Sequence, residues 1–270
     1  MTVSRPWRIG LRTLALAYLG ALLFVPVGLV FYRTFEHGIA AVWASITTPA
    51  AIHAFQLTLT VTAIAVPLNT VFGIVMALAL ARGRWRGKGI VNALIDLPFA
   101  VSPIVIGLSL VLVYGIHGWL GPALTKAGVQ VIFSVPGIVL ATIFVSLPFV
   151  VREVTPVLKE IGDEQEQAAA TLGAGAWTTF RRVTLPSIRW GVAYGVVLSV
   201  ARCIGEFGAV SVVSGKIAGE TDTLTLLVEK RFSNFDLAGA YAASALLALI
   251  ALGTLLVMTM IKPRREEGDA

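Results

Sequence analysis

The chain has little charge and almost no cysteine. Of its 270 residues only 13% are charged, and Cys203 is the single cysteine. Soluble domains carry about 25% charged residues, so these side chains are too few to cover a water-soluble globule. One cysteine cannot form an intrachain disulfide, which excludes a disulfide-stabilised secreted scaffold. The composition also excludes a disordered tail and a typical cytosolic enzyme.

The chain also lacks the motifs of several catalytic classes. There is no G-x-x-x-x-G-K-[ST] phosphate loop, since the nearest string, Gly83–Gly89, is one residue short and ends in glycine. There is no H-E-x-x-H zinc motif, and the string around Ser109 is a poor match to G-x-S-x-G. We therefore expect no catalysis, no cofactor and no metal in this chain. Any nucleotide energy would come from another subunit.

Apolar residues, by contrast, are abundant. They make up 57% of the sequence, and the mean hydropathy is +0.85. A membrane-spanning helix needs about 20 mostly apolar residues. Five charge-free runs approach or exceed that length: Leu14–Tyr32, Leu57–Ala81, Leu97–Ile116, Ala127–Val151 and Leu237–Ile261. A sixth run, Trp190–Gly215, contains Arg202 and Glu206. The sequence predicts an all-α, polytopic membrane protein with six transmembrane helices in a single domain, residues 1–270.

The basic start of the chain resembles a signal peptide. Arg5, Arg8 and Arg12 precede an apolar run of 19 residues. Cleavable signals have apolar cores of about 7–15 residues. We therefore interpret this run as a retained first span.

Basic residues set the expected orientation. With the N-terminus inside, 15 of the 21 fall in inside segments: Arg5, Arg8, Arg12, Arg82, Arg84, Arg86, Lys88, Arg152, Lys159, Arg181, Arg182, Arg189, Lys262, Arg264 and Arg265. Five fall outside: Arg33, Lys126, Lys216, Lys230 and Arg231. Positive charge accumulates in cytoplasmic loops, so we expect a multi-pass plasma membrane protein with both termini cytoplasmic. The basic charge reflects topology, and no nucleic-acid partner is expected.

The longest expected cytoplasmic segment, residues 152–189, has a pattern of its own. Good helix formers run from Glu164 to Leu172, and Gly173 and Gly175 interrupt them. Trp177, Phe180 and Val183 then recur every third residue, before Pro186. This predicts two short helices at an angle, the second ended by the proline. Such a hairpin suits a docking element or an amphipathic segment resting on lipid headgroups, and composition alone does not choose between them.

The same segment resembles the cytoplasmic signature of ABC importer permeases, E-A-A, three residues, glycine, then F-x-x-V-x-L-P. The residues at or beside those positions are Glu166, Gln167, Ala168, Ala169, Gly173, Phe180, Arg181, Val183, Leu185 and Pro186. Gln167 replaces the leading glutamate of the signature. The resemblance implies that this loop is the coupling helix, seated in a cleft of the ATP-hydrolysing subunit.

The resemblance extends over residues 55–250. The strings at 94–105, 145–153 and 201–215 are similar to those of the sulfate/thiosulfate importer group, and the first is most like its CysW-type subunit. This implies a type I (MetI-like) permease fold in a bacterial inner membrane. It also implies a second homologous permease subunit, two copies of an ATP-binding ABC subunit and an extracytoplasmic sulfate-binding protein, in membrane lipid.

Charges and helix breakers in the spans suggest a substrate path. Arg202 and Glu206 are four residues apart and would share a face of one helix. They are either a neutralised pair at a helix interface or part of the path, with the arginine meeting an oxyanion. Ser102 and Pro103 begin the third span at a possible helix break. The candidate pathway residues are Ser102, Pro103, Arg202, Glu206, Ser211 and Ser214.

Two alternatives remain open from the sequence. One is a molybdate or tungstate permease of the same importer class, because the Gly205–Ala209 string occurs there too. The other is half of an ion-coupled secondary transporter or a channel. That class needs several membrane acids or coupling-ion ligands, and the spans hold only Glu206, with Asp96 at an edge.

Overall fold

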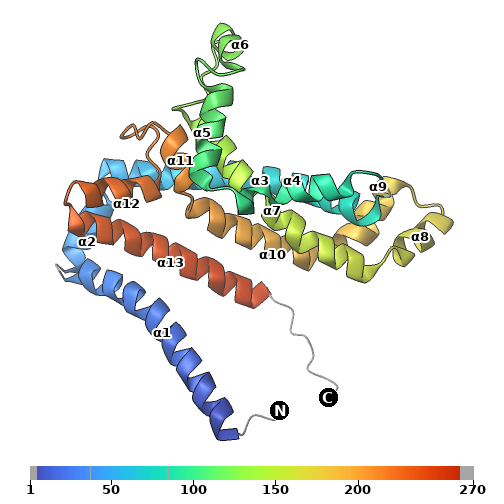
Figure 1. The fold of residues 1–270 in the computed structure, drawn as a ribbon, viewed down its shortest axis with the longest axis horizontal. Helices are drawn as coiled ribbons and strands as arrows, with labels where there is room; N and C mark the ends of the chain where they lie inside the picture. Colours follow the sequence, from blue (N-terminus) through green and yellow to red (C-terminus); the bar gives the residue numbers. More distant parts are fainter. Residues whose placement is uncertain (1–4, 37, 84, 262–270) are drawn as a thin grey trace.

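The structure is a computed structural model that describes residues 5–36, 38–83 and 85–261, and within them it is helical without a strand (Figure 1). Four of the basic residues that set the expected orientation lie outside these ranges, namely Arg84, Lys262, Arg264 and Arg265.

Five helices are long and apolar enough to cross a membrane. They are α1 (Arg5–Phe35), α3 (Pro49–Arg82), α7 (Val135–Ile161), α10 (Leu185–Ile204) with the turns before it, and α13 (Leu237–Ile261). The prediction of spanning helices is therefore confirmed in these five regions.

The third predicted span is not one straight helix. The chain forms α4 (Lys88–Ala100) and α5 (Pro103–Tyr114), which meet at 111°. Ser102 has φ −58° and ψ 135°, since a residue before proline is pushed out of the helical region. The possible helix break at Ser102 and Pro103 is therefore present, whereas one straight span over Leu97–Ile116 was a wrong prediction. Within the described residues, a sixth candidate span is obtained only if this bent pair is counted as one span, and α5 turns away from the bundle in Figure 1.

The fourth span has different limits from those expected. α6 (Gly121–Lys126) ends just before the fourth run, the first residues of that run form a loop, and α7 begins only at Val135. α7 then continues to Ile161, so the first ten residues of the segment 152–189 are helix and not loop. Hydropathy marks where side chains become polar, but a helix does not have to end where it leaves the apolar layer.

The core lies where α3, α7 and α10 pack together. A Cβ atom on Gly73 would lie 2.6 Å from the Cβ of Val150, and one on Gly195 would lie 2.9 Å from the Cα of Val150. Glycine at these positions lets the backbones approach closely. Polar groups add to the packing, because Asn69 donates to the hydroxyl of Ser146 at 2.8 Å and to the carbonyl of Ile143 at 3.0 Å.

The two ends of the bundle carry different elements. At one end α2 (Ile39–Ile46) and α12 (Leu224–Ser233) lie beside the start of α13, and at the other end lie α8 (Glu164–Thr171) and α9 (Ala176–Thr179) (Figure 1). Arg231 connects the elements at the α2 and α12 end. It donates to the carbonyls of Ser45 and Gly239 and to the hydroxyl of Thr48. α1 contacts only α13 and α2 to any extent among the described helices.

Candidate functional site

The segment between α7 and α10 forms the predicted pair of short helices. α8 ends at Thr171, and Gly173 follows with φ +83°, in the left-handed region that favours glycine. The N–H groups of Gly173 and Ala174 donate to the carbonyls of Ala170 and Ala169, both at 3.0 Å. These bonds satisfy carbonyls at the end of α8 and turn the chain toward α9.

Pro186 does not end the second helix, contrary to expectation. A π-helical turn, Phe180–Thr184, joins α9 to α10, and the N–H of Leu185 donates to the carbonyl of Phe180, five residues earlier. This wider turn allows a proline near the start of α10, because proline supplies no N–H and crowds the preceding turn. Helix therefore runs without interruption from Ala176 to Ile204.

The hairpin presents apolar side chains at its surface. Leu172 is 88% exposed and Trp177 is 71% exposed, and the Trp177 ring lies 5.6 Å from that of Phe180. Of the signature residues, Gln167, Ala168, Gly173, Arg181 and Pro186 are exposed, whereas Ala169, Phe180, Val183 and Leu185 are partly buried. Leu172 was not singled out from the sequence, because a single apolar residue at the end of an alanine-rich helix is unremarkable there.

Glu166 faces the opposite way, toward the bundle. Its carboxylate accepts from Nε of Arg82 at 2.9 Å and from the hydroxyl of Thr184 at 2.8 Å. Arg82 also donates to the carbonyls of Leu158 at 2.8 Å and Gly162 at 2.5 Å. From the sequence Arg82 is only one of the basic residues expected inside, since nothing in the spacing links it to Glu166.

The second candidate site is a break between α10 and α11 (Gly208–Val213). α10 ends at Ile204, so Arg202 and Glu206 do not share one helix as expected. Their side chains still meet, with Nη1 of Arg202 2.6 Å from Oε2 of Glu206. The Glu206 side chain is only 2% exposed and that of Arg202 is 30% exposed. A buried carboxylate therefore faces a cation that remains partly accessible.

The remaining pathway candidates lie at different distances from this break. Pro103 is close to it, because a Cβ atom on Gly208 would lie 2.8 Å from the Cβ of Pro103. Ser102 is exposed beside Pro103. Ser211 donates to the carbonyl of Gly208, and Ser214, which is fully buried, accepts from the N–H of Lys216. The hydroxyl of Ser214 therefore shapes the turn after α11 and is not open to solvent.

Cavities flank the break on the side of α12 and α13. One of about 320 Å³ is lined by Ala201, Gly205 and Thr225, and another of about 370 Å³ is lined by Phe207 and Thr225. Thr225 also donates to the carbonyl of Glu206 at 2.8 Å. Open space therefore meets the unwound backbone beside the Arg202–Glu206 pair.

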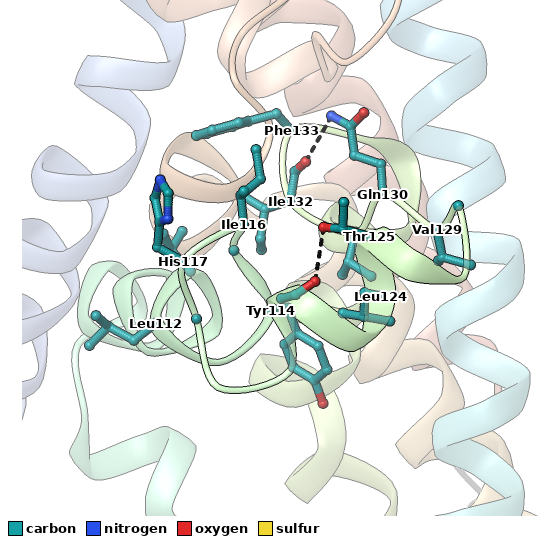
Figure 2. Close-up of a pocket in the computed structure, with 16 residues that line it drawn as sticks. Leu112, Tyr114, Ile116, His117, Leu124, Thr125, Val129, Gln130, Ile132 and Phe133 are labelled. Atoms are coloured by element: carbon teal, nitrogen blue, oxygen red, sulfur yellow. Dashed lines mark hydrogen bonds between the residues drawn. The ribbon is translucent and has the colours of Figure 1, made fainter.

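A larger cavity lies elsewhere, where α5, α6 and the loop before α7 meet (Figure 2). It has a volume of about 580 Å³, and its lining includes Tyr114, His117 and Phe133 but no lysine or arginine. Such a lining does not suit a dianion, which requires positive charge. Among the residues that the structure describes, no group of three or more His, Cys, Asp or Glu side chains is placed to hold a metal ion.

Comparisons with known proteins agree with this architecture. Residues 69–267 match the family described as "Binding-protein-dependent transport system inner membrane component". The sulfate transport system permease protein CysW of Synechocystis sp. is 49% identical over 254 residues, covering 94% of this chain and 92% of that protein. CysW of Escherichia coli K12 is 46% identical over 261 residues, covering 97% and 89%.

A solved structure has the same fold. In the crystal structure of a bacterial alginate ABC transporter in complex with an alginate pentasaccharide-bound periplasmic protein, one chain matches with a TM-score of 0.78 at 18% identity. The match covers 96% of this chain and 95% of that one. The chain therefore belongs to the family of inner-membrane components of binding-protein-dependent transport systems, with the ABC importer permease fold, and its sequence groups with the CysW permeases.

Proposed function

We propose that this chain is the membrane-spanning subunit of an ATP-driven importer for sulfate or thiosulfate. The observation that carries the proposal is the α8–α9 hairpin, which presents Leu172 and Trp177 at one end of a spanning bundle. Exposed aromatic and aliphatic side chains on a compact element are typical of a protein interface. The names of the CysW relatives supply the substrate, and they favour sulfate over molybdate or a secondary transporter.

In this proposal residues 1–270 form one permease domain without catalytic activity of its own. A second, homologous permease completes the path, two copies of an ABC subunit hydrolyse ATP, and an extracytoplasmic binding protein delivers the anion. Both termini and the hairpin are cytoplasmic, which agrees with the excess of basic residues at that side. The hairpin is the coupling element that the ATPase moves.

The substrate passes near the break between α10 and α11. A dianion needs hydrogen-bond donors and positive potential, and Arg202 offers both while Glu206 holds it when the path is empty. Pro103, the first residue of α5, packs against the start of α11. A shift of α5 would therefore also displace the backbone at the break. The backbone beside the break carries Ser102, which is exposed, and Ser211 and Ser214, whose hydroxyls bond to neighbouring backbone groups.

Gly173 offers a sharp test of hairpin docking. Space around Gly173 is open, as it is around Gly128, and both have positive φ. Gly173→Asp and Gly128→Asp therefore introduce the same charge at a left-handed position, one in the hairpin and one in the loop after α6. We expect Gly173→Asp to abolish copurification of the ATPase and radiolabelled sulfate uptake at normal membrane levels, and Gly128→Asp to retain ATPase binding.

Two results would contradict the proposal. If Gly173→Asp retained wild-type ATPase binding and uptake, the hairpin would not be the coupling element. If wild type with its full set of partners moved molybdate but no sulfate, the mechanism would stand and the substrate would be wrong.

A further inference from the structure

α8 has very little packing to hold it in place. None of its residues is buried, and glycine flanks it on both sides. Gly162 precedes it with φ +71° and Gly173 follows it with φ +83°, and a Cβ atom at either position would meet nothing within 4 Å. Side-chain packing therefore holds neither connection, so the direction of α8 depends on the few contacts that the helix itself makes.

Glu166 supplies that restraint. Among the described residues it is the only member of α8 whose side chain bonds to another helical element. Oε2 accepts from Arg82, the last residue of α3, and Oε1 accepts from Thr184 in the π-helical turn before α10. One carboxylate thus joins α8 to the ends of two spans.

Arg82 brings in a third span. Its guanidinium donates to the carbonyls of Leu158 and Gly162 at the end of α7, where carbonyls lack helical partners and a cation is favoured. α3 has 34 residues, which at 1.5 Å each is about 51 Å, longer than the ~30 Å apolar layer of a bilayer. α3 is therefore long enough to extend beyond the apolar layer, and Arg82 is its last residue.

We propose that Arg82 and Glu166, with Thr184, form a latch that makes α8 move as one body with the ends of α3, α7 and α10. The latch rests on the proposed function, in that it passes the motion of the ATPase from α8 to the spans. Glu166 is a positioning residue and contacts no substrate. Gln167, beside it, is exposed, so a neutral side chain at the signature position leaves the latch intact.

The test compares two identical charge removals on α8. Glu166→Gln breaks the ion pair, whereas Glu164→Gln removes an exposed carboxylate for which no ion pair is seen among the described residues. In the complete complex in liposomes, we expect Glu166→Gln to lower sulfate moved per ATP hydrolysed by about tenfold with the ATPase still bound. Glu164→Gln should match wild type. The double variant Glu166→Gln, Arg82→Gln should move no less sulfate per ATP hydrolysed than Arg82→Gln alone, because both substitutions act on one contact.

A second measurement does not depend on transport. Hydrogen exchange of the full-length chain should be about tenfold faster over residues 164–171 in Glu166→Gln, with α10 unchanged. Unchanged exchange, or wild-type coupling in Glu166→Gln, would overturn the latch. If wild type moved no sulfate, the proposed function would fail instead, and the exchange data would still decide whether the latch exists.

Discussion

The carboxylate of Glu206 accepts a hydrogen bond from the backbone N–H of Ala209 at 2.9 Å. Glu206 thereby caps the start of α11 with one oxygen while the other faces Arg202. A carboxylate at the start of a helix is stabilising, because it accepts from a free backbone N–H and lies at the positive end of the helix dipole. The pair therefore has a structural role at the break between α10 and α11. This role is separate from the role in transport that we propose for Arg202.

A double variant separates these two roles. Arg202→Gln should destabilise the protein by about 1–3 kcal/mol, because it leaves the buried Glu206 charge without its partner. Adding Glu206→Gln removes that charge, keeps an oxygen for Ala209, and should restore most of the thermal stability in detergent. We expect sulfate uptake to stay lost in the double variant, because the cation is still missing. Recovery of uptake along with stability would show that the arginine serves the fold alone.

Contact between α3 and α7 depends on the absence of a side chain at Gly73. Gly73→Ala should destabilise the protein by about 1–3 kcal/mol, since the added methyl would clash with Val150. Gly28→Ala in α1 is the control, because a Cβ atom there meets nothing within 4 Å. Melting temperatures of the two purified variants in one detergent check this prediction. Equal melting temperatures would mean that α7 can shift to make room.

The polar contact between Asn69 and Ser146 is buried in the core. Ser146→Ala removes the acceptor of one Asn69 hydrogen bond, and we expect a loss of about 0.5–1.5 kcal/mol in the free energy of unfolding. Ser109→Ala is the matched control, since the exposed Ser109 hydroxyl bonds only within its own helix to the carbonyl of Val105. Unfolding in mixed micelles measures both. An equal loss in the two variants would contradict a special role for the buried pair.

Arg231 and Lys216 allow a comparison of a buried and an exposed cation at the same end of the bundle. The Arg231 side chain is 12% exposed and joins α12 to the α2–α3 corner and to α13. Arg231→Ala should cost about 1–3 kcal/mol in the free energy of unfolding, because it removes the hydrogen bonds to the hydroxyl of Thr48 and to the carbonyls of Ser45 and Gly239. Lys216→Ala breaks only the exposed pair with Glu229, so we expect less than about 1 kcal/mol. Thermal unfolding measures both variants. A lower melting temperature for Lys216→Ala than for Arg231→Ala would contradict the prediction.

Some features could be predicted from local sequence because their cause is local. Apolar run length marks the spanning helices, and the φ preference of glycine marks the end of α8 at Gly173. The possible helix break at Ser102 and Pro103 also has a local cause, since the residue before proline avoids helix. Its sharp angle was not expected, because hydropathy continues smoothly across it.

Other features depend on residues far apart in the chain. Nothing in the spacing of Arg82 and Glu166 predicts their contact, because it requires α3 and α7 to end at the same level and α8 to fold back. The limits of α7 and α10 were likewise misjudged, since packing and not hydropathy decides where these helices stop.

The sequence by itself determined that this is a membrane protein and which loop resembles a coupling element, because transfer of apolar side chains from water depends on composition and run length. Only the tertiary structure decided which side chains meet. It turned the third span at Ser102, ended α10 before Glu206, and brought the guanidinium of Arg82 to the carboxylate of Glu166. Those outcomes follow from backbone approach at glycines and from the need of buried polar groups for partners, which no local stretch of sequence contains.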